Sequence, residues 1–297
     1  MYIVTGANSG IGLETTRQLV KQGGHVIMAC RRTDAAEKVA KSFTGLKGSY
    51  EVMRLDLAEL QSVRDFVAEF LEKHDKLDGL TCNAGLVTTG RIKHTKDGLE
   101  MTMAVNYFGH FLLTELLLDL LKKSAPSRMV IVSSLIHAGS KKNRPDIHLE
   151  DLNFNTRKFK RLTAYTEAKI ADVLYAMELA KRLEGTGVTT ASVHPGWARS
   201  NFGGLGMKFM NVLIFPFKHW LTDSNKDSAQ TSLHCLLSDD APKHSGAYFS
   251  QSCGLYRDKE RRDGGWPMKS PNPNARNMDT AKKLVDLSNK IVGLEKD

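Results

Sequence analysis

Short apolar runs alternate with longer stretches of helical periodicity along most of this 297-residue chain. Several runs are apolar on both alternating faces, which is typical of strands covered by helices above and below. Because the connections are short, the alternation predicts a single-domain, Rossmann-type α/β fold: a doubly wound parallel sheet of about seven strands with helices on both faces. We expect strands at Tyr2–Thr5, His25–Cys30, Glu51–Asp56, Leu77–Asn83, Arg128–Ser134, Val188–His194 and Gly246–Ser250, and helices near 10–22, 59–74, 97–123, 163–185, 226–238 and 278–294.

No internal repeat and no Pro/Gly/Ser-rich linker divides the chain, so residues 1–297 are predicted to form one domain. Two polar stretches, 139–160 and 255–277, are predicted to be surface loops. The first strand has only Met1–Val4 before its turn, which is short for the central strand of such a sheet. We therefore expect the natural chain to begin earlier than this sequence does.

The four cysteines lie far apart, and no basic-then-apolar signal segment precedes them. A disulfide framework is therefore not expected. The expected location is reducing and cytoplasmic, with membrane association as the alternative if the natural N-terminus is longer. Cys30 and Cys82 lie in apolar runs and are interpreted as small buried hydrophobic residues. The ten histidines form neither an H-x-x-x-H pattern nor a cluster with cysteine along the sequence, so no metal site is predicted.

The chain carries 42 basic and 33 acidic residues, which gives a formal net charge of +9. Such an excess fits a phosphorylated ligand, an anionic membrane surface or nucleic acid, and it fits a role in solubility equally well. No basic module with interleaved aromatic residues is present in the sequence, so nucleic-acid binding is not predicted.

A glycine-rich loop, Thr5–Gly12, connects the first predicted strand to the first predicted helix. Its glycines permit a tight turn and let backbone N–H groups approach a pyrophosphate, where the helix N-terminus adds about half a positive charge. Because the loop stands in the strand–loop–helix setting of a dinucleotide site, we interpret it as a phosphate-binding loop rather than a structural turn. The candidate residues are Gly6, Asn8, Ser9, Gly10, Ile11 and Gly12.

The ends of the next three strands supply candidates for the rest of a dinucleotide site. Arg31 and Arg32 follow the second strand, where an NAD site usually carries an acidic residue that binds the ribose 2′-hydroxyl. Two guanidinium groups pair well with a 2′-phosphate, so the sequence favours NADP(H); the alternative is a pair of solvated surface arginines. Candidates beside the adenine edge and along the nucleotide, after the third and fourth strands, are Asp56, Leu57, Asn83, Ala84 and Gly85.

Tyr165 and Lys169 are four residues apart near the start of a predicted helix, so their side chains share one face. An ammonium beside a phenol favours the phenolate and lowers the phenol pKa from about 10 toward neutrality, which gives a proton donor and acceptor usable at neutral pH. Ser133 and Ser134 end the preceding strand, where a hydroxyl could orient a carbonyl oxygen. The alternative interpretation of this spacing is an ordinary polar helix surface.

Together these motifs resemble a short-chain dehydrogenase/reductase over nearly the whole chain. The segments that carry the resemblance are, in order, Thr5–Gly12, Asn83–Gly85, Asn106 within Val105–Phe111, Ser133–Ser134, Tyr165–Lys169 and Pro195–Gly196. Six ordered motifs at plausible spacing are far more specific than any one of them.

The resemblance implies a role for each catalytic candidate. Tyr165 is expected to be the general acid/base, Lys169 to lower its pKa and hold the nicotinamide ribose, and Ser134 to orient the substrate. Asn106 is expected to kink its helix and hold a water for a proton relay. Pro195 and Gly196 are expected to run beside the nicotinamide. Trp197 follows them, where the family usually has a small or aliphatic residue, and it predicts a reshaped pocket wall.

The similarity extends to the retinol dehydrogenase and WW-domain oxidoreductase branch, through Ala29–Arg31, Leu179–Leu183, Gly185–Thr190, His194–Gly196, Ala229–Cys235 and Ser245–Ser250. It implies an NADP(H)-dependent oxidoreductase that interconverts a lipophilic aldehyde or ketone and its alcohol. One alternative is a protochlorophyllide-type C=C reductase, which is similar along Leu213–Leu221 but carries a cysteine where this chain has Trp197. The other is a catalytically silent nucleotide-binding scaffold, against which the intact catalytic set argues.

Residues 202–221 form an apolar stretch interrupted by Pro216 and by charged residues, so it is a poor transmembrane helix. Three interpretations stay open: part of an apolar substrate lid over about 198–225, a surface for peripheral membrane contact, or a core-facing segment. The long predicted helices at 97–123 and 163–185 could pair two subunits in the family manner, so a homodimer is also considered.

Overall fold

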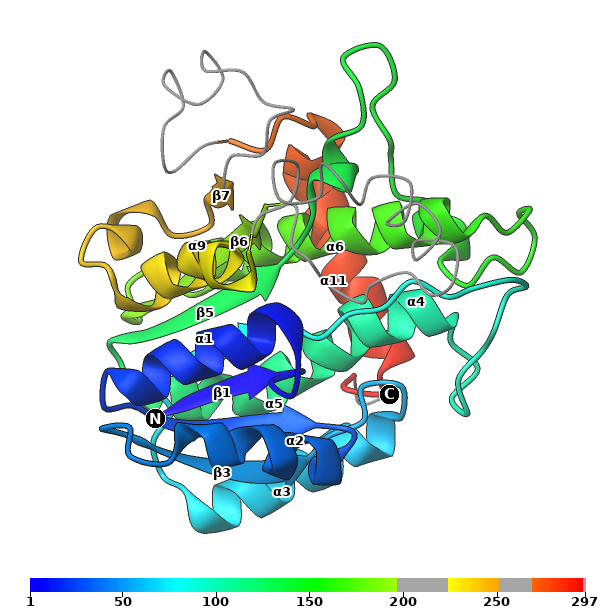
Figure 1. Cartoon of the computed structure of the whole chain (residues 1–297). Helices are drawn as coiled ribbons and strands as arrows, with labels where there is room; N and C mark the ends of the chain where they lie inside the picture. The colour runs from blue at the N-terminus through cyan, green and yellow to red at the C-terminus, as the bar shows by residue number, and fades with distance from the viewer. Residues whose placement is uncertain (197–223, 251–268, 296–297) are drawn as a thin grey trace, which may run out of the picture.

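The computed structural model describes residues 1–196, 224–250 and 269–295 of the chain. Its centre is a seven-stranded sheet in the order β3-β2-β1-β4-β5-β6-β7, and all neighbouring strands are parallel (Figure 1). The predicted strands are confirmed, with ends that differ by at most two residues. Their bounds are β1 Tyr2–Thr5, β2 His25–Cys30, β3 Ser49–Arg54, β4 Gly79–Cys82, β5 Ser127–Val132, β6 Val188–His194 and β7 Tyr248–Ser250.

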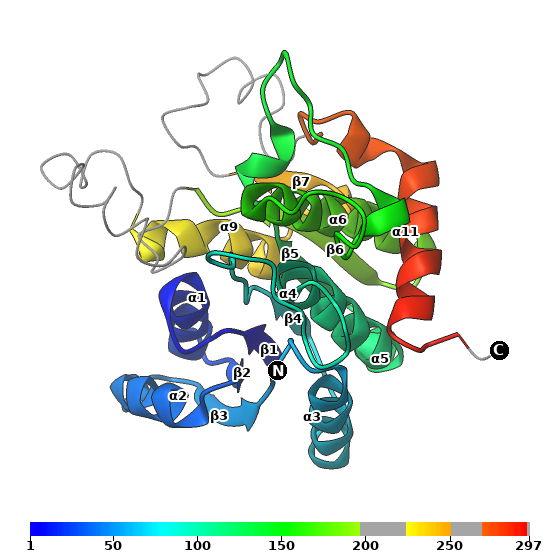
Figure 2. The same cartoon turned by 90° about the vertical axis from the view of Figure 1, so that its right-hand side faces the viewer.

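The sheet separates two hydrophobic cores because alternate residues of a strand point to opposite faces. In β1, Ile3 packs into one core and Val4 into the other. Helices cover both faces, as Figure 2 shows, which confirms the predicted doubly wound architecture. One core lies under α3 (Leu60–Lys73), α5 (Gly109–Lys123) and α6 (Arg161–Arg182), and the other under α1 (Gly10–Lys21), α2 (Thr33–Ala40) and α9 (Asn225–Leu237).

Two helical features differ from the prediction. The sequence pattern does not predict α2, because its buried face carries only Ala36 and Ala40, which give weak hydrophobic periodicity. The helix predicted over 97–123 is instead a short helix α4 (Met101–Met103), a π-helical turn η2 (Ala104–Phe108) and α5. By length and composition 101–123 could cross a membrane, but 83% of its apolar window is buried inside the protein. Core packing therefore accounts for its apolar composition.

Helix α11 (Met278–Ile291) packs along the outer side of α6 (Figure 2). Leu284 is fully buried there, and the hydroxyl oxygens of Tyr107 and Ser288 lie 2.9 Å apart in a hydrogen bond. This helix therefore covers part of the helix pair through which the sequence suggests a homodimer. The homodimer stays a prediction.

The stretch 139–160 is more than the surface loop that its polar composition predicts. Ile147, Leu152 and Phe154 are buried in it, and it contains the 3₁₀ turn η4 (Leu149–Asp151). More than half of the segment is exposed, as predicted, and these few apolar side chains anchor it to the core. Of the other predicted loop, only 269–277 is described, and it contains the 3₁₀ turn η7 (Asn274–Arg276).

Cys30 and Cys82 are buried free thiols, as predicted. Other sequence-based predictions fall on residues 197–223 and 251–268, which lie outside the described residues. They include the lid over 198–225 apart from its last two residues, the apolar stretch 202–221, Trp197 and Cys253.

Candidate active site

The strand ends that carry the predicted motifs meet at one edge of the sheet. The strand order reverses between β1 and β4, and open parallel sheets bind ligands outside the carboxyl ends of the strands at such a point. Gly6 follows β1 and Asn83 follows β4, and the two segments are joined because Asn83 Nδ2 donates to Thr5 O at 2.8 Å. Ser134 and Pro195 follow β5 and β6 at the same edge.

The loop between β1 and α1 has a close-packed side and an open side. Gly6 and Gly10 have φ angles of 67° and 59°, in the left-handed region that favours glycine. A Cβ at Gly12 would lie 2.4 Å from Asn83 Nδ2 and 2.6 Å from Gly6 O, so only glycine lets α1 begin this close to the strand ends. A Cβ at Gly10 would meet nothing within 4 Å. The loop and the N-terminus of α1 therefore fit a pyrophosphate that approaches from the Gly10 side.

The other loop candidates differ in what they do in the structure. Ser9 is exposed immediately before α1, and its side chain makes no capping hydrogen bond. Asn8 is half-buried. Ile11 is also half-buried but packs against the core beneath α1, so its side chain anchors the helix rather than facing the opening.

Thr5 and His110 hold the ends of β1 and β4 together. The backbone N–H groups of Asn83 and Ala84 both donate to Thr5 Oγ1 at 2.9 Å. His110 Nδ1 donates to Asn106 O at 3.2 Å, so in a neutral ring Nε2 accepts the Thr5 hydroxyl proton, at 2.8 Å. Burial lowers the pKa of His110 to about 3, which keeps the ring neutral and fixes the direction of these hydrogen bonds.

Arg31 and Arg32 are exposed at the carboxyl end of β2, where Arg32 immediately precedes α2. Within the described part of the chain, neither guanidinium makes an ion pair or a side-chain hydrogen bond. Both positive charges therefore stay available to an anionic group at this edge of the sheet.

The candidates after β3 and β4 have local structural roles as well. Asp56 Oδ1 accepts the N–H of Ala58 at 3.0 Å and so closes the turn that leads into α3. Leu57 is buried beneath Gly109 of α5, where a Cβ would lie 2.5 Å from Leu57 O. Gly85 is half-buried after β4.

Tyr165 lies near the start of α6 between the Ser134 hydroxyl and the Lys169 ammonium. Ser134 hydrogen-bonds the Tyr165 side chain, and Lys169 Nζ lies 5.7 Å from the centre of the phenol ring. Burial raises the pKa of Tyr165, while the Lys169 charge and the Ser134 hydrogen bond lower it without offsetting the burial. The predicted net fall toward neutrality is therefore wrong for this chain: the pKa lies above its ordinary value.

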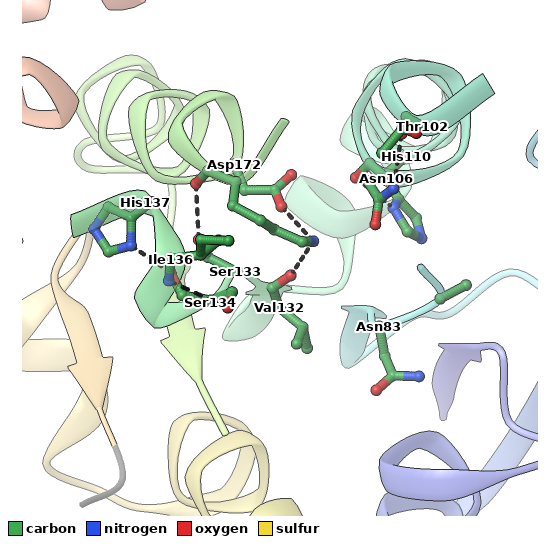
Figure 3. Close-up of polar contacts among 12 residues, drawn as sticks. Asn83, Thr102, Asn106, His110, Val132, Ser133, Ser134, Ile136, His137 and Asp172 are labelled. Carbon is green, nitrogen blue, oxygen red and sulfur yellow. Dashed lines mark hydrogen bonds and ion pairs between the residues drawn. The ribbon is translucent and has the colours of Figure 1, made fainter. Parts of the chain in front are cut away.

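The Lys169 ammonium is buried and makes two charge-assisted hydrogen bonds. Nζ donates to Val132 O at the end of β5 and to Asp172 Oδ2 on the same helix, each at 2.8 Å (Figure 3). Burial acts to lower the pKa of Lys169, but Asp172 and Tyr165 outweigh it and raise the pKa, so the lysine is charged at neutral pH. Because an ammonium has three N–H groups, one remains for a ribose hydroxyl.

Asn106 lies in the π-helical turn η2, so the predicted irregularity of its helix is present. Its Nδ2 donates to Thr102 O at 2.7 Å and to Leu86 O at 2.8 Å, and its Oδ1 accepts the Leu86 N–H at 3.3 Å. The side chain therefore ties the turn to the segment that follows β4. Its part in a proton relay stays a prediction.

Ser134 begins the 3₁₀ turn η3 (Leu135–Ala138), and its Oγ accepts the Ile136 N–H at 3.4 Å. His137 Nδ1 donates to Ser134 O at 2.5 Å, and its Nε2 accepts from Ser270 Oγ at 2.8 Å. Figure 3 shows His137 directed at the Ser134 turn. The C-terminal segment thus braces the turn that presents the serine. After β6, Pro195 and Gly196 are buried, and Gly196 has a φ of 86°.

Known proteins resemble this chain in sequence and in fold. The family model described as short chain dehydrogenase matches residues 1–144. Retinol dehydrogenase 13 of Homo sapiens is 40% identical over 301 residues, which cover 99% of this chain and 84% of the relative. The chain belongs to the short-chain dehydrogenase/reductase family.

Two further matches agree with that assignment. Retinol dehydrogenase 11 of Homo sapiens is 38% identical over 100% of this chain and 87% of its own. The crystal structure of an uncharacterised protein from Mycobacterium paratuberculosis superimposes with a TM-score of 0.72 at 28% identity, over 98% of this chain and 92% of that one. The chain is accordingly an oxidoreductase of the family that acts on alcohols and carbonyl groups with a nicotinamide cofactor.

Two groups at the site of this short-chain dehydrogenase are not among the residues predicted from its sequence. Asp172 follows Lys169 by three residues, a spacing that places both on one helix face and could have indicated the ion pair. The brace formed by His137 and Ser270 joins segments 133 residues apart, and no local pattern indicates it.

Proposed function

We propose that this chain is an NADP(H)-dependent oxidoreductase that interconverts a lipophilic aldehyde or ketone, such as a retinoid, and its alcohol. The observation that carries the proposal is the meeting of Ser134, Tyr165 and Lys169 at the edge of the sheet where the open glycine loop lies. The relatives named retinol dehydrogenase support the lipophilic substrate.

The bound nicotinamide supplies or accepts the hydride. In carbonyl reduction the Ser134 hydroxyl donates to the carbonyl oxygen and the Tyr165 phenol delivers the proton; in alcohol oxidation Tyr165 takes it back. Ser134 Oγ accepts the Ile136 N–H, which leaves its own proton for the substrate oxygen or for Tyr165. Lys169 stabilises the phenolate by its charge and offers its third N–H to a ribose hydroxyl. Because the pKa of Tyr165 is raised, the phenol is protonated at neutral pH, which suits reduction.

Two guanidinium groups that pair with no side chain in the described residues support NADP(H) over NAD(H). Arg31 and Arg32 stand where the adenosine ribose of a dinucleotide comes to the end of β2, and Asp34, the nearest acid, lies beyond them in the first turn of α2. The carboxylate that could accept from a ribose 2′-hydroxyl, Asp34, therefore lies away from the end of β2. The two arginines, which could donate to a 2′-phosphate, lie at that end.

The test follows consumption of NADPH and of NADH at the nicotinamide absorbance, with all-trans-retinal compared against short and aromatic aldehydes. NADPH-dependent turnover of retinal is the expected result. Turnover of small carbonyls alone would discard the lipophilic substrate but keep the chemistry. Failure to turn over any carbonyl despite tight NADPH binding would favour the scaffold alternative.

The variant Tyr165→Phe removes only the phenolic oxygen. We expect turnover to fall by at least about 100-fold while NADPH binding is retained, because general acid/base catalysis is lost. Tyr175→Phe is the matched control on the same helix, where the hydroxyl donates to Glu115 instead. Equal activity of the two variants would contradict the role of Tyr165.

A further inference from the structure

Three metal-ligating side chains converge at the end of the sheet opposite the candidate active site. His25 begins β2, Glu51 lies in β3, and His74 immediately follows α3. The register pairs His25 with Ser49 and Ile27 with Glu51, so alternation along the parallel strands directs His25 and Glu51 to the same face. That face is covered by α3, whose last turn brings His74 alongside. The start of β1, marked N in Figure 1, lies at this end of the sheet.

The ligand atoms of the three side chains are near enough to share one ion. One imidazole nitrogen from each histidine and one carboxylate oxygen all lie within 4.8 Å of one another. His74 Nε2 and Glu51 Oε2 are 3.2 Å apart, which matches the separation of about 3.3 Å between two ligands of a tetrahedral ion with bonds of about 2.0 Å. All three side chains are partly exposed, so an ion and a water could enter.

The neighbours of the cluster orient its ligands. Ser49 Oγ lies 2.6 Å from His25 Nδ1 in a hydrogen bond, which fixes the ring of the first ligand. Lys73 Nζ donates to Glu51 Oε1 at 3.4 Å, so it holds the oxygen that does not face His74. The positive charge of Lys73 opposes a cation, but Glu69 accepts from the same ammonium at 2.7 Å and offsets it. Hydrogen-bonded supports of this kind are typical around metal ligands.

We propose that His25, Glu51 and His74 form a binding site for one divalent transition-metal ion, with Zn²⁺ as the ion that suits two imidazoles and a carboxylate. Three protein ligands leave a fourth position for water. The ion would link the paired strands β2 and β3 to the residue that follows α3. Because the site lies at the opposite end of the sheet from Tyr165, its effect is on stability and not on the reacting groups. The sequence pattern predicts no metal site because the ligands come from three separate segments.

The experiment uses the full chain without a histidine tag, stripped with a chelator and titrated with Zn²⁺ by calorimetry. We expect one site per chain and a thermal unfolding temperature that rises with Zn²⁺, because an ion that binds only the folded state stabilises it. His25→Gln and His74→Gln should each weaken Zn²⁺ binding by at least about tenfold and abolish the rise in melting temperature. His94→Gln, at an exposed histidine outside the cluster, is the matched control and should bind like the parent.

Glu51→Gln provides a second test that keeps the shape of the side chain and its hydrogen-bonding oxygen. It should weaken Zn²⁺ binding while circular dichroism shows an unchanged fold. Co²⁺ in place of Zn²⁺ should give the visible absorption of a four-coordinate site in the parent and not in the histidine variants. Equal Zn²⁺ binding by the parent and the cluster variants would overturn the proposal, as would absence of binding to the parent. In either case the cluster would be a hydrogen-bonded His–Glu group without an ion.

Discussion

Replacing Asp172 by Asn tests how charge is distributed around Tyr165. Asp172 and Lys169 form a buried ion pair, and the carboxylate counteracts the effect of the ammonium on the phenol. The change to Asn keeps the size of the side chain and an oxygen that can accept from Lys169. It removes the negative charge, so the Lys169 charge acts on Tyr165 unopposed. The pKa of Tyr165 should therefore fall.

The structure sets the size of this effect. Asp172 Oδ2 lies 2.8 Å from Lys169 Nζ, and Nζ lies 5.7 Å from the centre of the Tyr165 ring, so the carboxylate is within about 8.5 Å of the ring. With an effective dielectric constant of about 20, a unit charge at that distance changes the energy of the phenolate by about 2 kcal/mol. This energy corresponds to about 1.4 pKa units.

The assay is the pH dependence of kcat/KM for alcohol oxidation, which reports the pKa values of the free enzyme. The ascending limb of this pH profile, which follows loss of the Tyr165 proton, should move to lower pH by about one unit in Asp172→Asn. Glu115→Gln is the control, because it removes a carboxylate that pairs with Arg182 farther along α6. Its limb should stay in place, and thermal unfolding should establish that both variants are folded.

Two outcomes would refute the reasoning. An unchanged limb would mean that the carboxylate does not influence the reacting phenol. A limb moved to higher pH would mean that Lys169 loses its proton when its partner is removed, so the ammonium would not be held by the remaining hydrogen bond to Val132 O. If Tyr165→Phe retained full turnover, by contrast, the proposed function would fail and not the electrostatic argument about Asp172.

Three further predictions follow from the cofactor side and from the buried histidines. The double change Arg31→Ala and Arg32→Ala should raise KM for NADPH at least about tenfold and leave KM for NADH nearly unchanged, and equal effects on both would contradict the 2′-phosphate assignment. Gly12→Ala places a Cβ 2.4 Å from Asn83 Nδ2 and should cost about 1–3 kcal/mol in unfolding free energy and weaken NADPH binding, measured by denaturation and titration. Acid should destabilise the fold, because burial lowers the pKa of three histidines below their value of 6.5 in the unfolded chain, and the unfolded state takes up protons that the folded state does not. Stability present above pH 6.5 should be lost as the pH falls, by up to about 4 kcal/mol per pH unit between about pH 6 and 4, in denaturation curves recorded at each pH. Those histidines, with pKa values of about 3, 4 and 3, are His110, His137 and His194.

Much of the fold could be predicted because its signals are local. Strands buried on both faces appear in the sequence as apolar runs. The glycines at 6 and 10 indicate a turn that needs positive φ. The sequence pattern does not predict helix α2 because alanines make up its buried face, and the polar composition of 139–160 does not indicate the few buried apolar residues that anchor this loop. Both features depend on tertiary packing by few or small side chains.

The sequence could predict which residues form the site, but not the direction in which the pKa of Tyr165 is shifted. Spacing in the sequence places Lys169 beside Tyr165, and the contact is present in the structure. The direction of the Tyr165 pKa, however, depends on how deeply the phenol is buried and on a carboxylate that partly cancels the lysine charge. Burial arises from segments distant in sequence, so no motif contains it.

Asp172 shows the difference between what spacing in the sequence indicates and what burial in the structure adds. Its three-residue spacing from Lys169 is visible in the sequence, but spacing alone allows a solvated pair that contributes little. The structure shows that both side chains are almost fully buried, where the carboxylate stabilises the lysine charge and opposes its action on the phenol. Desolvation acts against the Lys169 charge, and the Asp172 carboxylate opposes it together with the hydrogen bond to Val132 O. Asp172 therefore supports the ammonium charge and also raises the pKa of the Tyr165 phenol. Together these effects favour delivery of a proton to a carbonyl oxygen at neutral pH.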